Sequence, residues 1–69
     1  ELEHIINSTL NKLPERRMQI FKMHRMYGKK YKEIADFFSI SVKTVEAEMT
    51  KAYKTLRQAI EKYTLNHGF

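Results

Sequence analysis

Apolar side chains recur along this chain at the three- and four-residue spacing that places them on one face of a helix. The pattern predicts helices at about residues 2–11, 14–27, 31–38 and 42–63. In the last segment the apolar positions form a stripe over several turns: Val45, Met49, Ala52, Tyr53, Leu56, Ile60 and Tyr63. Runs of β-branched residues with a period of two are missing. The sequence therefore predicts an all-α fold of four helices.

Three short breaks separate these segments. Leu13 is pushed out of the helical region by Pro14, which itself suits a first helical turn. Gly28 follows the second segment, and three residues, 39–41, separate the third from the fourth. The hydroxyl of Ser41 can accept from a free backbone N–H, so we expect Ser41 to cap the fourth helix.

The third and fourth segments, with their three-residue connection, have the layout of a helix-turn-helix. The small Ala35 leaves room for the second helix to cross closely, while Val45 and Met49 anchor that helix. Ile40 fills the turn. Ser39 stands where glycine is favoured because the site often takes a positive φ. The prediction is a helix-turn-helix without a wing; two antiparallel helices of an ordinary bundle are the alternative.

The helical wheel of the second motif helix favours recognition of DNA. With the apolar stripe turned inward, the opposite face presents Lys43, Thr44, Ala47, Glu48, Lys51 and Lys54. Small side chains let a helix approach bases closely, lysine can donate to guanine, and glutamate can accept from the cytosine amino group. We therefore predict that this face enters the major groove.

The net charge of +5 is distributed unevenly along the chain. Residues 1–11 carry −2, residues 33–69 are balanced, and residues 12–32 carry eight basic side chains against one acidic, a net of +7. The middle stretch is thus a candidate phosphate-facing surface. Glu46 and Glu48 on the reading helix would reduce promiscuous binding and favour particular bases.

Length and composition argue against several other functions. The 69 residues allow one domain and no cysteine is present, which excludes disulfides and thiolate metal sites. The three histidines stand far apart without ligand partners, so we expect no metal, no cofactor and no enzyme activity. No run approaches the roughly 18 apolar residues of a membrane span. A basic amphipathic helix at 14–27 could lie on a membrane, but the core needs its apolar face.

Most aromatic and methionine side chains fall on the inward stripes, and we expect them to fill the core rather than to stack on bases. These residues are Phe21, Tyr31, Phe37, Phe38, Tyr53 and Tyr63, with Met18, Met23, Met26 and Met49. The chain begins with Glu1 and shows no signal peptide, so we expect it to be a piece of a longer protein.

Several short motifs occur in a characteristic order: LPERR at residues 13–17, IF at 20–21, GKKYKEIA at 28–35, SISVKTVE at 39–46, KA at 51–52 and LR at 56–57. Their order and spacing resemble region four of a bacterial sigma factor, and are most similar to the extracytoplasmic-function type. The resemblance covers about residues 2–60, nearly the whole chain.

The resemblance implies a cytoplasmic four-helix domain that binds the −35 promoter element in the major groove. It also implies contact with the flap of the RNA polymerase β subunit and, often, control by an anti-sigma factor. Carried over by position, bases would be read by Lys43, Thr44, Ala47, Glu48 and Lys51. Phosphates would be contacted by His24, Arg25, Lys29, Lys30 and Lys32. Members usually carry more arginine or lysine on the reading helix than this chain does.

Two other interpretations remain open at this stage. The output domain of a LuxR-type regulator shares the EIA and TV motifs, but usually ends its long helix with KL and a glycine soon after. Here KAYKTLR at 51–57 continues the helix, which favours the sigma factor. The third interpretation is a helical bundle that binds only other proteins, for instance one that is held by an anti-sigma factor.

Overall fold

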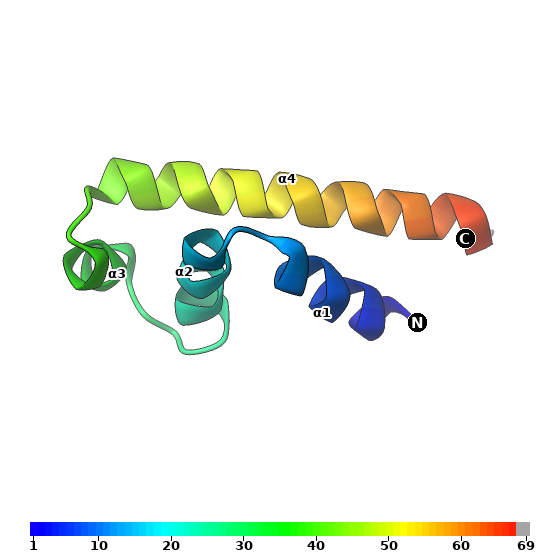
Figure 1. Ribbon diagram of the computed structural model, residues 1–69, viewed down its shortest axis with the longest axis horizontal. Coiled ribbons are helices and arrows are strands. Elements are labelled where there is room, and N and C mark those ends of the chain that lie inside the picture. Colours follow the sequence, from blue (N-terminus) through cyan, green and yellow to red (C-terminus); the bar gives the residue numbers. More distant parts are fainter. Residues whose placement is uncertain (68–69) are drawn as a thin grey trace.

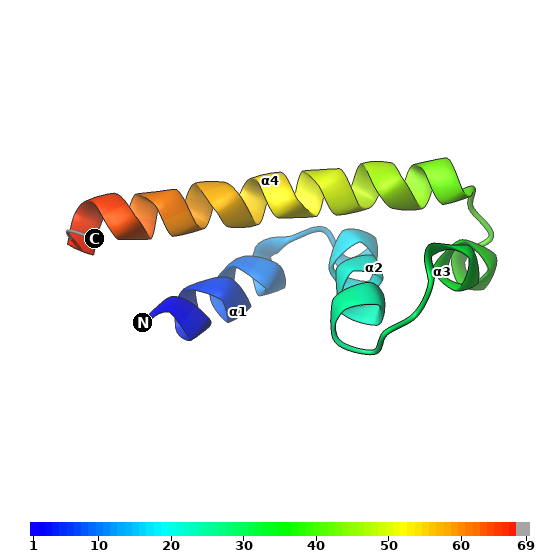
Figure 2. The same ribbon diagram turned by 180° about the vertical axis from the view of Figure 1, so that it is seen from behind.

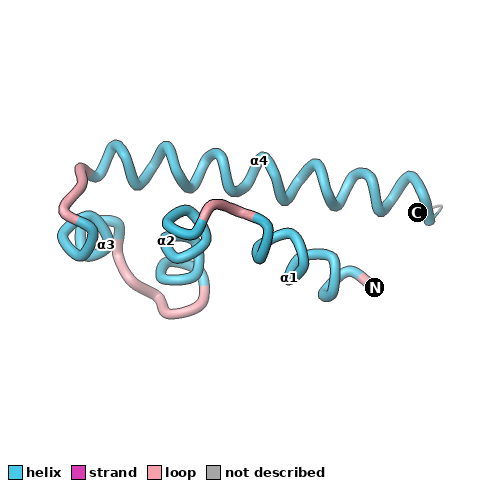
Figure 3. The backbone as a smooth tube through the Cα atoms, viewed as in Figure 1, coloured by secondary structure: helices cyan, strands magenta, loops and turns pink. Residues whose placement is uncertain are grey.

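The computed structural model describes residues 1–67, and this part of the chain consists of four helices joined by short loops (Figure 3). The helices are α1 (Leu2–Lys12), α2 (Glu15–Arg25), α3 (Tyr31–Phe38) and α4 (Val42–His67). The prediction of an all-α, four-helix fold is therefore confirmed. Two boundaries differ from expectation by more than one residue: α2 ends at Arg25 rather than at 27, and α4 continues past 63 to His67.

The long helix α4 is the element against which the other three helices pack (Figures 1 and 2). Its 26 residues, at a rise of 1.5 Å each, extend about 39 Å and account for most of the 42 Å long axis of the molecule. α1 lies antiparallel beside the C-terminal half of α4, α2 packs against the middle, and α3 lies near the N-terminal end (Figure 1).

The core consists of one stripe of α4 and the side chains that the other helices bring to it. Its members are Leu10, Leu13, Ile20, Phe21, Ile34, Ala35, Val45, Met49, Ala52 and Leu56. The inward residues expected of the motif are buried: Ala35 is 3% exposed, Val45 0% and Met49 2%. Full burial of each large apolar side chain contributes about 1.5–3 kcal/mol, so this stripe holds α4 in place.

The turn of the motif has the backbone geometry expected for its position. Ser39 adopts a left-handed conformation with φ of 56°. The N–H of Ile40 donates to the carbonyl of Ala35 at 2.9 Å, and that of Ser39 donates to Asp36 at 3.3 Å, which is a Schellman motif. Two residues on, the hydroxyl of Ser41 accepts from the N–H of Thr44 at 3.0 Å. The helix-turn-helix and its serine cap are thus confirmed.

The expectation that the aromatic and methionine residues fill the core is wrong for three of them. Phe37 is 70% exposed, Met26 52% and Tyr53 40%. Phe37 is exposed because α3 has only two turns, and its packed face is occupied by Ile34, Ala35 and Phe38. Met26 directly follows the last residue of α2, at the start of the loop to α3.

Candidate nucleic-acid interface

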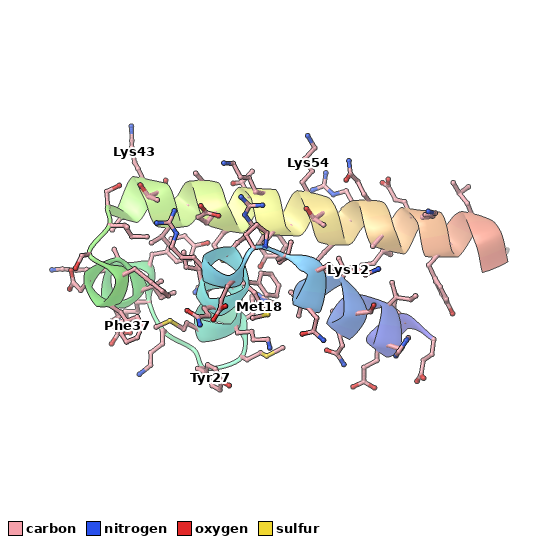
Figure 4. The ribbon with its side chains drawn as sticks, viewed as in Figure 1. Lys12, Met18, Tyr27, Phe37, Lys43 and Lys54 are labelled. Atoms are coloured by element: carbon pink, nitrogen blue, oxygen red, sulfur yellow. The ribbon has the colours of Figure 1, made fainter. Side chains whose placement is uncertain are left out.

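The outer face of α4 is open along its first three turns. Lys43, Ala47, Lys51 and Lys54 are all exposed and follow one another at helical spacing. From Lys43 to Lys54 the helix rises about 16 Å. Both of these lysines point away from the rest of the molecule (Figure 4). A continuous face of this kind, at the N-terminal end of a second motif helix, has the placement needed to enter a major groove.

Thr44 lies at the edge of this face rather than at its centre. Its side chain is half-buried, and its hydroxyl is 3.0 Å from the hydroxyl of Ser41, which caps the helix. The capping hydrogen bond thus limits the orientations available to Thr44. Among the expected base readers, Lys43, Ala47 and Lys51 share the open face, and Thr44 borders it.

Glu48 does not lie on the exposed face, and this expectation is wrong. It is only 9% exposed because the N-terminal turn of α2 covers that side of α4. Arg17 Nε donates to Glu48 Oε1 at 2.7 Å, and Arg16 Nη2 donates to Glu48 Oε2 at 3.1 Å. Each carboxylate oxygen thus accepts from one arginine, and Glu48 links α2 to the reading helix instead of facing solvent.

The ionised form of Glu48 is stabilised by this pairing. The hydrogen bond from Arg17 lowers the pKa of Glu48 below its ordinary value of 4.5; burial opposes the shift, and the bond from Arg16 adds to it. The spacing along α4 indicates the burial of Glu48. Glu48 stands three residues after Val45 and four before Ala52, and both of these residues are buried.

The Glu48 pairing also changes the interpretation of the basic stretch. Arg16 and Arg17 direct their guanidinium groups at Glu48, so they contribute less to the positive field around the molecule. The six other cations of the stretch form no ion pair within the described residues: Lys12, Lys22, Arg25, Lys29, Lys30 and Lys32. Apart from Lys12 at the end of α1, the free positive charge therefore belongs to α2, the following loop and the start of α3.

His24 has a structural role that the sequence did not indicate. Its Nδ1–H donates to the carbonyl of Lys29 at 2.9 Å, and its ring packs edge-on against Tyr31 with centroids 4.7 Å apart. A carbonyl can only accept, so Nδ1 carries the hydrogen. Nε2 then carries no hydrogen in the neutral ring, so it could donate to a phosphate only if the ring were a charged imidazolium. His24 therefore serves first to hold the loop between α2 and α3.

The remaining expected phosphate contacts fall into two places. Lys30 and Lys32 flank the start of α3, where the carboxylate of Glu33 accepts from the N–H of Lys30 at 2.8 Å. Arg25 ends α2, and Lys29 lies in the loop after Gly28, whose φ is 68°. That loop lies across the molecule from the outer face of α4 in both views (Figures 1 and 2).

Among the side chains that the structure describes, no group of three or more histidine, aspartate or glutamate residues is arranged to hold a metal ion. None of the helices described combines the length and apolar character required to cross a membrane.

Comparison with known protein families identifies a match that covers most of the chain. Residues 3–56, which include α1 from its second residue, α2, α3 and the N-terminal half of α4, match the family model described as "Sigma-70, region 4". No curated protein and no solved structure shows a match.

Proposed function

Because this chain belongs to the sigma-70 region 4 family of helix-turn-helix DNA-binding domains, we propose that it recognises the −35 promoter element. It does so as part of a bacterial sigma factor of the extracytoplasmic-function type, which directs RNA polymerase to promoters in the cytoplasm. The observation that supports this most strongly is the open face of α4 directly after a Schellman turn. The family match also favours the sigma factor over a LuxR-type regulator.

Base recognition is assigned to Lys43, Ala47 and Lys51, with Thr44 at the edge of the contact. Lysine can donate to guanine O6 and N7, and alanine permits close approach to a thymine methyl. Glu48 is left out of the reading set because it is buried against α2 and its two carboxylate oxygens face Arg16 and Arg17. Glu46 is exposed and can accept from the amino group of a cytosine.

Phosphate contact is assigned chiefly to Lys30 and Lys32. Both cations stand beside the N-terminal end of α3, where the helix dipole is already positive. The first-turn carboxylate of Glu33 offsets part of this positive charge, and a DNA phosphate would offset more. α3 packs directly against α4, so these lysines can hold the backbone while α4 reads the groove.

Contact with the polymerase flap is assigned to the opposite half of α4. There an apolar groove of about 360 Å³ lies between α1, α2 and α4. Its lining residues are Ile6, Phe21, Arg25, Tyr53, Leu56, Arg57, Ile60 and Glu61. An anti-sigma factor would inhibit the domain by covering either this groove or the reading face.

The DNA-binding proposal is tested by selection from a randomised duplex library with the 69-residue chain, followed by titration of the enriched and a scrambled duplex at several salt concentrations. We expect a preferred sequence and an affinity that falls steeply with salt, because phosphate contacts release counterions. Equal affinity for both duplexes, or a flat salt response, would overturn the proposal. Weak affinity at low salt alone would not.

A further inference from the structure

An apolar groove between α2 and α3 takes no part in the function proposed above. It encloses about 330 Å³ and is lined by Met18, Gln19, Lys22, Met23, Tyr27 and Phe37. Two of these residues are among the most exposed large apolar side chains: Phe37 at 70% and Tyr27 at 69%. Phe37, Tyr27 and Met18 lie on the side of the molecule opposite Lys43 and Lys54 (Figure 4). The groove therefore faces away from the reading face.

Phe37 is held in position even though most of its ring is exposed. It packs edge-on against Phe38, with ring centroids 5.0 Å apart and an interplanar angle of 85°. Phe38 in turn packs against the buried core. The ring of Phe37 is thus oriented before any partner arrives, which reduces the entropy lost on binding. Exposed apolar side chains grouped around a concavity mark an interaction site.

We propose that this groove docks an amphipathic helix of a partner protein, with apolar residues in the groove and acidic residues along one edge. The charge of the groove supports this choice. Lys22 lines it, and Lys29 lies two residues beyond Tyr27; neither lysine has an ion pair within residues 1–67. The α3 edge carries Asp36 beside Phe37, so the acidic edge of the partner faces α2.

Other occupants fit these observations less well. A second copy of the chain, with its net charge of +5, would bring cations against Lys22 and Lys29. A DNA duplex offers phosphates but no apolar side chain to fill the concavity between Phe37 and Met18. A membrane surface would pair with a flat apolar and basic face rather than with a groove. Because the groove and the reading face lie on opposite sides, a partner in the groove leaves the reading face of α4 open.

The probe is a fluorescent synthetic helix with leucines at i, i+4 and i+7 and glutamates along one flank. Its matched control carries lysine at each glutamate position. In anisotropy titrations with the 69-residue chain, we expect the glutamate peptide to bind about tenfold more tightly than the lysine peptide. Lys22→Glu should narrow or reverse this preference.

Phe37→Ala should weaken binding of the glutamate peptide about fivefold or more, because it removes the aromatic wall of the groove. The control is Leu65→Ala, which removes an apolar side chain that is 83% exposed near the C-terminal end of α4. It should leave peptide binding unchanged. Both variants should keep the helical circular dichroism spectrum and melting temperature of the parent, since both side chains are mostly exposed.

Several results would overturn the proposal: no binding of the glutamate peptide, equal binding of both peptides, or an affinity that Phe37→Ala leaves unchanged. Self-association of the chain that Phe37→Ala abolishes would identify a second copy as the occupant instead. Binding to phosphatidylglycerol vesicles that depends on Phe37 would identify a membrane. Displacement of the peptide by duplex DNA would place the groove in the nucleic-acid interface. None of these readouts requires that the −35 proposal be correct.

Discussion

Glu48 occupies the interface between α2 and the reading helix, where its two carboxylate oxygens accept from Arg16 and Arg17. Of the two contacts, the one with Arg17 is shorter and better shielded: the side chain of Arg17 is 21% exposed, against 49% for Arg16. The more exposed pair, Arg16 with Glu48, contributes little to stability because solvent screens it. Arg17 therefore provides most of the electrostatic link between the two helices.

Glu48→Gln should lower the free energy of unfolding at pH 7 by about 1–3 kcal/mol, because the neutral amide cannot match the charged hydrogen bonds. The pKa of Glu48 is lowered in the folded protein, so its contribution to stability is present above the ordinary value of 4.5. That contribution is lost as the pH falls below 4.5 through the folded pKa. Urea denaturation at pH 7 and at lower pH values measures both effects.

The matched control for this prediction is Glu46→Gln, which neutralises an exposed glutamate two residues away. Glu46→Gln should change the free energy of unfolding much less than Glu48→Gln does. The loss of stability below pH 4.5 should remain in this variant. An equal loss in both variants would show that the effect belongs to net charge rather than to the arginine contacts.

Ser39 holds the turn between α3 and α4 in a conformation that suits glycine better. Its φ of 56° brings the Cβ atom close to the backbone, a penalty that glycine lacks. Ser39→Gly should therefore raise the free energy of unfolding by up to about 1 kcal/mol, whereas the β-branched Ser39→Val should lower it. Urea denaturation of the parent chain and the two variants measures these changes. A Ser39→Val variant more stable than Ser39→Gly would contradict the prediction.

At the scale of elements, the proposed contact with DNA is divided between α3 and the N-terminal half of α4. In this proposal the lysines at the start of α3 contact the DNA backbone, while the open face of α4 carries the side chains that can reach base edges. Contacts with phosphates position a protein on the duplex, and contacts with bases select the sequence. Substitutions at the start of α3 should therefore change the overall affinity for DNA, whereas substitutions on α4 should change the preferred sequence.

Lys30→Ala should weaken binding to the preferred and the scrambled duplex by similar factors, because it removes a phosphate contact. The slope of log affinity against log salt should fall by about 1. The control is Lys12→Ala, which removes one positive charge from the last turn of α1, at a distance from α3. It should reduce the affinity for DNA less. A loss confined to the preferred duplex would instead assign Lys30 to base recognition.

Lys51→Ala should change which base pair is preferred at one position of the site, at a cost of about 1–3 kcal/mol for the original base. Binding to the scrambled duplex should change much less. Library selection with the variant reveals the altered position, and Lys62→Ala, farther along α4, is the control. An unchanged consensus would remove Lys51 from the reading set.

At the scale of the whole molecule, α4 connects two surfaces with different proposed partners. Its N-terminal half presents the reading face, and its C-terminal half forms the apolar groove assigned to polymerase. The helix extends about 39 Å, so the two partners need not compete for the same residues. DNA and polymerase can therefore be bound together, as promoter recognition requires.

Ile60→Ser should reduce binding of the chain to polymerase core enzyme several-fold while leaving its affinity for DNA unchanged. Ile60 is half-buried and lines the groove, so a polar side chain there lowers the apolar area available to a partner. Leu65→Ser is the control on the same helix. Pull-down with core enzyme and anisotropy with duplex DNA separate the two effects, and parallel loss of both would indicate misfolding.

The four helices, the turn and the core stripe were predictable because they follow from local chemistry. Helical spacing placed Val45, Met49 and Ala52 inward, and a small residue at Ala35 marked the crossing of the two motif helices. The hydroxyl of Ser41 and the open turn at Ser39 mark where α4 begins. Each of these features depends mainly on residues within a few positions of one another, so the sequence indicates them, apart from the exact helix ends and the exposed Tyr53.

The tertiary structure alone decided which polar and aromatic side chains are covered by other helices. Glu48 is buried because α2, more than thirty residues earlier in the chain, brings two arginines to that side of α4. Phe37 is exposed because the short α3 has already filled its inner face. The periodicity of a single helix reports one face of that helix, whereas burial at its edges depends on where its neighbours cross.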